Sequence, residues 1–281
     1  MANLRLILIL LSIISIIHSN PITEAQHNQI KFLVENKAFN GIKALDGSYH
    51  SIIPDNYDWR KQYPNCFRAV KSQGKCSSSY ALSVSATLES RVCINSNGNN
   101  NFELSPQDIL SCGFNEKRCK LEASLKDTWE YVERNGLLTE KCFPYLSKEG
   151  SIVPQCPSSC VYNKDPFYRY KALTGSFHFV KGIVEIKTEI MIYGPVTTVM
   201  TVYEDFALYN GGLYEYQYGK QMSDLSVTIV GWGKENGIDY WIVRNTWGMY
   251  WGENGYFRIK INDPKSNIEN NVGVSKSLLW Y

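Results

Sequence analysis

Residues 73–80 carry the stretch that decides the fold: Gln73-Gly74-Lys75-Cys76-Ser77-Ser78-Ser79-Tyr80. A helical pattern begins at the end of this stretch, because apolar residues recur every four positions over 79–93, at Tyr80, Val84, Leu88 and Val92. That spacing places them on one face of a helix. The sequence therefore sets a serine, Ser79, at the start of a predicted helix, directly after a loop that contains glycine and cysteine.

The N-terminus predicts the compartment. A short basic start that ends at Arg5 is followed by an unbroken run of apolar residues and serine over 6–17, and Pro21 follows soon after. This pattern is typical of a signal peptide, expected over 1–19, and the run is too short to cross a membrane. Residues 20–53 are polar and predict a short pro-segment, an N-terminal extension or a linker. We expect the mature protein to be secreted or delivered to a lysosomal or vacuolar lumen.

Charge and cysteine count narrow the possible partners. The formal net charge is +2 and becomes +1 when Arg5 is removed with the signal peptide, which gives no reason to expect nucleic-acid or membrane partners. The even number of cysteines in an oxidising compartment indicates four disulfides. A zinc site is the alternative, but the spacing lacks paired CxxC motifs and histidine is scarce, so we expect no metal or cofactor. The cysteines are Cys66, Cys76, Cys93, Cys112, Cys119, Cys142, Cys156 and Cys160.

The predicted secondary structure changes at about residue 165. Before that point the sequence predicts two more helices, and after it predicts short strands separated by Gly and Asn turns. A helical half followed by a β-rich half indicates two lobes of an α+β protein, with one globular domain over 54–281. The expected helices are 106–112 and 125–133, and the expected strands are 226–232, 240–244 and 255–261.

Several segments, in order, resemble the papain family of cysteine peptidases and its cathepsin B-like branch in particular. Besides 73–80 they are 58–66, 194–196, 202–206, 231–237 and 240–248. The resemblance runs from Pro54 to the C-terminus. It implies a papain-like fold with a helical left lobe, a β-barrel-like right lobe and a cleft between them. It also implies the disulfide pairs Cys66–Cys93, Cys76–Cys119, Cys112–Cys156 and Cys142–Cys160.

The resemblance assigns a catalytic role to four positions. Gln73 matches the side-chain donor of the oxyanion hole, and Asn245, shielded by Trp247, matches the residue that orients the catalytic histidine. The nucleophile position carries Ser79 instead of cysteine, and the histidine position carries Leu225. A serine hydroxyl stays a neutral alcohol where a thiol would ionise, and leucine cannot accept its proton.

No other histidine is an obvious substitute for the base. His18, His27 and His50 precede the globular domain, and His178 lies in the strand-like run 176–180, which we expect to be exposed and distant from the cleft. The cleft itself is altered, since Leu121 and Glu122 stand where the family carries a Gly-Gly that lets substrate approach. The family's His-His occluding loop is also missing between Cys142 and Cys160, so carboxydipeptidase activity has no support.

Three functions are compatible with this sequence. The first is an inactive papain-family homologue, a monomer that binds peptides, proteins or cystatin-type protease inhibitors in its cleft. The second is a peptide-bond hydrolase that uses Ser79 with an unrecognised base. The third is a structural component of a wall or matrix, although the sequence has neither repeats nor adhesive tracts. The double loss at Ser79 and Leu225 favours the first.

Overall fold

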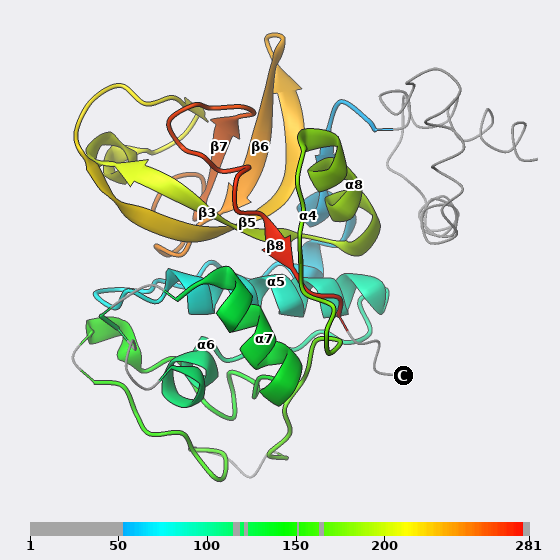
Figure 1. Ribbon diagram of the computed structural model, residues 1–281, viewed down its shortest axis with the longest axis vertical. Helices are drawn as coiled ribbons and strands as arrows, with labels where there is room; N and C mark the ends of the chain where they lie inside the picture. The colour runs from blue at the N-terminus through cyan, green and yellow to red at the C-terminus, as the bar shows by residue number, and fades with distance from the viewer. Residues whose placement is uncertain (1–52, 115–118, 121–122, 151, 163–165, 278–281) are drawn as a thin grey trace, which may run out of the picture.

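The computed structural model describes residues 53–114, 119–120, 123–150, 152–162 and 166–277 (Figure 1). The predicted signal peptide over 1–19, almost all of the predicted extension, and both Leu121 and Glu122 lie outside the described residues. The described chain forms the two lobes of an α+β protein, as predicted. No helix among the described residues is both long and apolar enough to cross a membrane.

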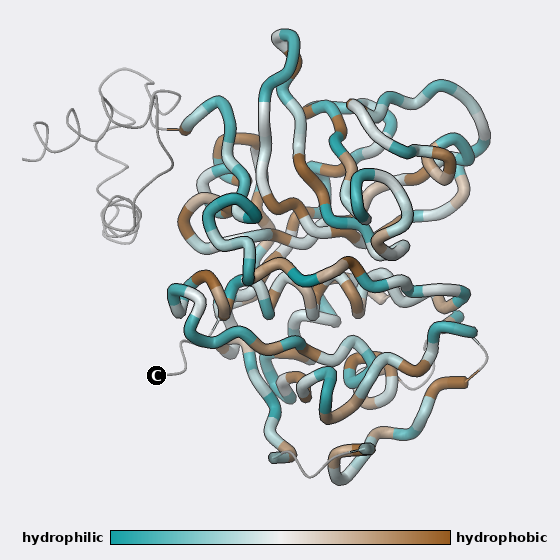
Figure 2. The backbone as a smooth tube through the Cα atoms, turned by 180° about the vertical axis from the view of Figure 1, so that it is seen from behind, coloured by the Kyte–Doolittle hydropathy of each residue, from teal (hydrophilic) through white to brown (hydrophobic). Residues whose placement is uncertain are grey.

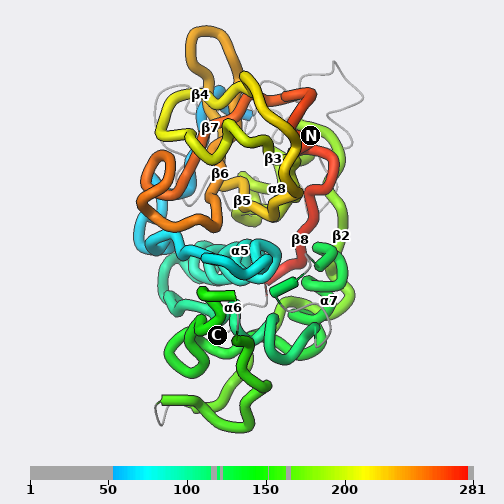
Figure 3. Tube along the Cα trace, turned by 90° about the vertical axis from the view of Figure 1, so that its left-hand side faces the viewer, coloured from blue at the N-terminus to red at the C-terminus, as the bar shows by residue number. Residues whose placement is uncertain are grey.

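Helix α5, Ser79–Asn95, lies across the middle of the molecule. Figures 1 and 3 show α6 and α7 on one side of α5 and the β-rich lobe on the other. Nearly every residue of α5 is buried, which is why the helix is not strongly amphipathic. The predicted apolar positions are fully buried or almost so, and the helix runs two residues beyond the predicted end at Cys93.

The remaining helices of the left lobe are short. Ser105 and Ser124 cap α6 and α7, because each side chain accepts the backbone N–H three residues later. Gly136, with a φ of 74°, ends α7 after Asn135, two residues beyond the predicted end at Glu133. The predicted helix 106–112 is split into α6 and a π-helical turn. The elements are α4 (Trp59–Gln62), η2 (Pro64–Cys66), α6 (Pro106–Asp108), η3 (Ile109–Gly113), α7 (Leu125–Asn135) and η4 (Ser147–Glu149).

All four predicted disulfides are present in the structure: Cys66–Cys93, Cys76–Cys119, Cys112–Cys156 and Cys142–Cys160. No cysteine is free. Every bridge joins segments within the first 160 residues, so the cross-links hold the helical lobe and its connecting loops. No cysteine follows Cys160 in the sequence, so no disulfide cross-links the strands from β2 to β8.

The right lobe is built on one curved eight-stranded sheet in the order β2-β8-β3-β5-β6-β7-β4, with β1 paired to β5. All pairs are antiparallel except β4 with β7. The β5–β6 hairpin turns at Asn236 and Gly237, which both have positive φ. In Figure 2 this hairpin is hydrophilic at its tip and more hydrophobic where it enters the body of the lobe. The strands are β1 (Tyr57–Asp58), β2 (His178–Phe179), β3 (Val196–Tyr203), β4 (Leu213–Tyr214), β5 (Gln221–Glu235), β6 (Ile238–Arg244), β7 (Tyr256–Lys260) and β8 (Gly273–Val274).

The predicted strands 226–232 and 240–244 lie within β5 and β6, and the predicted strand 255–261 contains β7 with one extra residue at each end. Two helical elements of this lobe were not predicted, namely α8 (Ile183–Tyr193) and η5 (Glu204–Leu208). Strand β5 is longer than expected, and its middle, at Ser226 and Thr228, is bonded to α5. This contact between α5 and β5 brings Ser79 and Leu225 to the boundary between the lobes.

Candidate functional site at the start of helix α5

Ser79 is the first residue of α5, and its side chain is completely buried. Its Oγ accepts a hydrogen bond of 2.9 Å from the backbone N–H of Ser226 on β5. A nucleophile must reach a carbonyl carbon of a bound substrate, which requires exposure and a base that takes the proton. Here the hydroxyl serves as an acceptor between two packed elements.

Leu225 precedes Ser226 on β5 and is therefore next to Ser79. It is 3% exposed and pairs with Met200 across the sheet. Its surroundings belong to the hydrophobic core of the molecule. The position that the resemblance assigns to the family's histidine is thus filled by an apolar side chain that neither donates nor accepts a proton.

A ladder of hydroxyl groups continues from Ser79 along α5. The Oγ atoms of Ser83 and Ser226 lie 2.7 Å apart, and the Oγ1 atoms of Thr87 and Thr228 lie 3.0 Å apart. Because residues four apart share a helix face, Ser79, Ser83 and Thr87 all face β5. We did not predict this ladder, although the repeat of hydroxyl residues every four positions was the signal that identifies it.

Gln73 also connects the two lobes. Its Nε2 donates to the carbonyl of Cys76 at 2.9 Å, and its Oε1 accepts from Thr246 Oγ1 at 2.7 Å. Its backbone N–H donates to the carbonyl of Thr246 as well. The side chain predicted as an oxyanion donor therefore already has one N–H bonded within its own loop.

The hydroxyl of Tyr145 contacts the loop before α5. Its hydroxyl donates to the carbonyl of Gln73 at 2.9 Å and lies 2.7 Å from Ser78 Oγ. Burial raises the pKa of Tyr145 to about 12, so the phenol stays protonated at physiological pH. It therefore holds the loop in place and supplies no base.

Asn245 has no imidazole to orient. Its Oδ1 accepts the N–H of Thr246 at 2.7 Å, and its buried Nδ2 has no partner among the described residues. Asn245 borders a cavity of about 20 Å³ that Glu89 and Arg244 also line. Trp247 packs edge to face against Phe206, with ring centroids 5.4 Å apart. The indole expected to shield a contact between Asn245 and a histidine is therefore present, but the site has no such contact.

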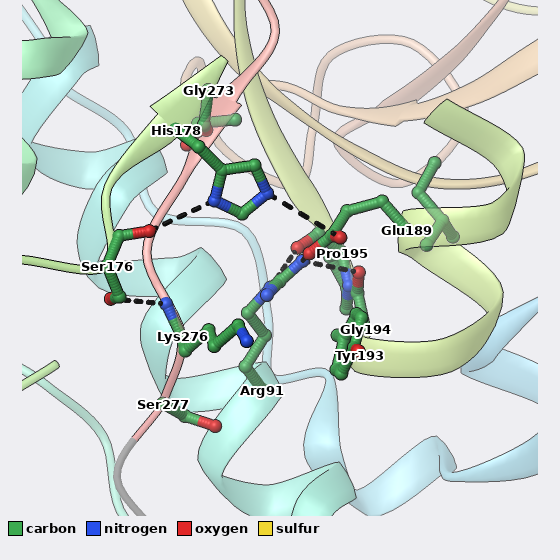
Figure 4. Close-up of polar contacts among 12 residues, drawn as sticks. Arg91, Ser176, His178, Glu189, Tyr193, Gly194, Pro195, Gly273, Lys276 and Ser277 are labelled. Atoms are coloured by element: carbon green, nitrogen blue, oxygen red, sulfur yellow. Dashed lines mark hydrogen bonds and ion pairs between the residues drawn. The ribbon is translucent and has the colours of Figure 1, made fainter. Parts of the chain in front are cut away.

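His178 lies in another part of the molecule. It is on β2, where its ring faces the carbonyl of Ser176 and the carboxylate of Glu189 (Figure 4). Glu189 is bonded to Arg91, which is twelve positions after Ser79 in α5, or about 18 Å along the helix axis. The histidine is half-buried and bonded to other groups, so it does not serve Ser79.

Two further acids come close to the site without serving it. Asp224 precedes Leu225 and is exposed, and its Oδ1 accepts from Thr201 Oγ1 at 3.2 Å. Glu89 is fully buried at the cavity, where burial raises its pKa and the backbone N–H of Leu104 donates to it. Among the contacts of the described residues, none joins Ser79 to a carboxylate or an imidazole, and no group of three His, Cys, Asp or Glu could hold a metal ion.

Comparisons with known proteins agree with this architecture. Residues 53–276 match the model of the papain family cysteine proteases. The chain is 34% identical over 220 residues to a cathepsin B-like protein, CP3, of Giardia intestinalis, covering 78% of this chain and 73% of that protein. It is 35% identical over 255 residues to cathepsin B-like cysteine proteinase 3 of Caenorhabditis elegans, covering 80% and 66%. The solved structure of procathepsin B S9 from Trypanosoma congolense superposes with a TM-score of 0.72 at 28% identity, covering 80% of this chain and 78% of that one.

Proposed function

The chain belongs to the papain family of cysteine proteases and is cathepsin B-like, and from this membership we propose that it is a catalytically inactive member that acts by binding. One observation carries the proposal. The hydroxyl at the nucleophile position is buried and accepts the N–H of Ser226, next to a leucine at the histidine position. In a cysteine protease of this family these two positions would form the thiolate–imidazolium pair.

The size of the expected loss supports inactivity. In a serine protease, removal of the nucleophile or its base lowers turnover about 10⁶-fold, and what remains comes from the oxyanion hole and substrate binding. In this chain one N–H of the Gln73 amide already donates to the carbonyl of Cys76, which leaves one N–H for an oxyanion. Activity useful to an organism would need a base that the contacts of the described residues do not supply.

We propose that the ligand is an extended peptide or a protein segment, including cystatin-type protease inhibitors, held at the boundary between the lobes. The papain-like fold and its four disulfides support a rigid surface for such a ligand, and Trp247 packs beside that boundary against Phe206. The disulfides also support an oxidising compartment, so we propose a secreted protein or one in a lysosomal or vacuolar lumen. We expect it to act as a monomer.

Two measurements test this proposal. Hydrolysis of a fluorogenic peptide library is compared between the natural protein and Ser79→Ala, with an active papain-family protease as the positive control. Both proteins should show equally low background rates. Turnover by the natural protein that Ser79→Ala abolishes would overturn inactivity. Calorimetric titration with a cystatin-type inhibitor and with the same peptides should show binding, and no heat from any of them would overturn the binding role.

A serine-dependent peptide hydrolase is the second candidate, because Ser79 begins a helix and both Gln73 and Asn245 are retained. Its requirement is a base within hydrogen-bond distance of the Ser79 hydroxyl. The same hydrolysis experiment distinguishes it, since only this candidate predicts turnover that depends on Ser79.

A further inference from the structure

A histidine and a buried ion pair join three elements at the far end of α5 from Ser79. Arg91 of α5 is 1% exposed, and its Nη2 lies 2.7 Å from Glu189 Oε1 on α8. The same guanidinium donates through Nε to the carbonyl of Pro195 at 2.6 Å. The other carboxylate oxygen of Glu189 lies 3.7 Å from His178 Nε2 on β2. Figure 4 shows the three side chains in a row.

Both ring nitrogens of His178 face hydrogen-bond acceptors. Nδ1 lies 3.0 Å from the carbonyl of Ser176, and Nε2 faces the Glu189 carboxylate. A neutral imidazole has only one N–H and would leave an acceptor opposite a lone pair, whereas the imidazolium donates from both nitrogens. The geometry therefore fits the charged form of His178.

We propose that His178, Glu189 and Arg91 form a pH-sensitive clasp between the lobes, closed in mildly acidic medium and weakened as the medium becomes neutral to alkaline. The clasp links the central helix of the left lobe to α8 of the right lobe and to the strand that crosses between them. This proposal stands apart from the proposed function, because it concerns the coupling of the lobes and involves no residue of the Ser79 site.

The charges around His178 act in opposite directions. Glu189 attracts the imidazolium from α8, while Arg91 repels it from α5. On β8 and just beyond it, the nearest charged residue is Lys276, whose ammonium lies over the Tyr193 ring at 5.7 Å and whose N–H donates to Ser176 Oγ. Glu133 of α7 is occupied by backbone N–H groups of residues 175–177. The contact with Glu189 prevails.

The direction of the pH dependence follows from these contacts. The contact with the Glu189 carboxylate raises the pKa of His178, although burial opposes it. Burial alone would raise the pKa of Glu189, but Arg91 and His178 lower it. Stabilisation by His178 is thus complete below its ordinary pKa of about 6.5 and is lost as pH rises through the raised value. Stabilisation by Glu189 is present above its ordinary pKa of about 4.3. The clasp is fully charged between these limits.

Thermal unfolding of the natural protein and of His178→Gln at pH 5 and pH 8 tests the clasp. We expect the natural protein to unfold about 2–4 °C above the variant at pH 5, with the difference disappearing at pH 8. Glu185→Gln, one turn earlier on α8, is the matched control and should keep the natural pH profile. An equal difference at both pH values would mean that His178 has only a packing role and would overturn the proposal.

Proton NMR titration of His178, the one histidine among the described residues, gives a second readout. We expect its pKa to be higher in the natural protein than in Glu189→Gln. Because Glu189→Gln leaves Arg91 buried without its counter-charge and can prevent folding, His178→Lys provides a further variant. Its permanent cation should keep at pH 8 the stability that the natural protein shows at pH 5. Titration of His178 at the ordinary value, or no gain at pH 8 in His178→Lys, would overturn the proposal.

Discussion

Ser79 has a structural role at the start of α5. The resemblance to the papain family assigns this position to the thiol that attacks substrate, whereas here it carries a buried hydroxyl that accepts the N–H of Ser226. The neighbouring candidate residues also make structural contacts, since Leu225 packs in the core and Asn245 accepts the backbone N–H of Thr246. At the scale of single residues, the site has therefore become part of the interface between the lobes.

Ser79→Ala should destabilise the protein rather than impair a reaction. It leaves the buried N–H of Ser226 without an acceptor, which costs about 1–3 kcal/mol of unfolding free energy. Urea unfolding followed by tryptophan fluorescence measures this loss. Ser158→Ala, at an exposed serine, is the control and should change stability by less than about 0.5 kcal/mol. A Ser79→Ala protein as stable as the natural one would show that its hydroxyl is dispensable for folding.

The hydroxyl ladder between α5 and β5 makes a prediction at the scale of elements. Thr87 and Thr228 are buried and bonded to each other at 3.0 Å. Thr87→Val and Thr228→Val should each cost about 1–3 kcal/mol, because each leaves a buried partner less well bonded. The double variant should lose less than the sum, with a coupling energy of about 0.5–3 kcal/mol in denaturant unfolding.

An exposed pair provides the comparison for that cycle. Glu130 and Arg134 lie four apart on α7, 2.9 Å from each other at the surface. Their coupling should be no more than about 0.5 kcal/mol. If the Thr87–Thr228 coupling were as small, the ladder would contribute little to holding the lobes together.

Sequence patterns predicted some elements and missed others for physical reasons. Helix α5 was predictable because its apolar residues repeat every four positions. Helix α8 was missed because its many β-branched residues suit a strand as well as a helix, so its packing against the sheet decides its form. The first residues of β5, Gln221–Asp224, are all exposed and, apart from Met222, polar, so no alternation between buried and exposed residues marked them. Their pairing with β3 makes them a strand.

For the candidate site, the sequence predicted which positions to examine but not the burial or the contacts of their side chains. Matching motifs identified Gln73, Ser79, Leu225 and Asn245, and the resemblance gave all four disulfide pairs. The burial of Ser79 and its bond to β5 join residues 147 positions apart, so no local pattern contains them. Likewise, His178 was expected to be exposed, whereas it is half-buried against Glu189 on α8, an unpredicted helix.

At the scale of the whole molecule, the two lobes are stabilised in different ways, and reduction should reveal it. All four disulfides lie in the first 160 residues, and each stabilises by about 2–4 kcal/mol, so their sum is comparable with the total stability of a typical domain, about 5–15 kcal/mol. Because β5 of the right lobe packs against α5 of the left lobe, we expect the right lobe to unfold with the left. Thiol titration of denatured, unreduced protein should find no free thiol, and titration after reduction should find eight. Reduction should also abolish the near-ultraviolet circular dichroism of the aromatic residues in both lobes. Native dichroism after complete reduction would show that the sheet and its core hold the fold without the cross-links.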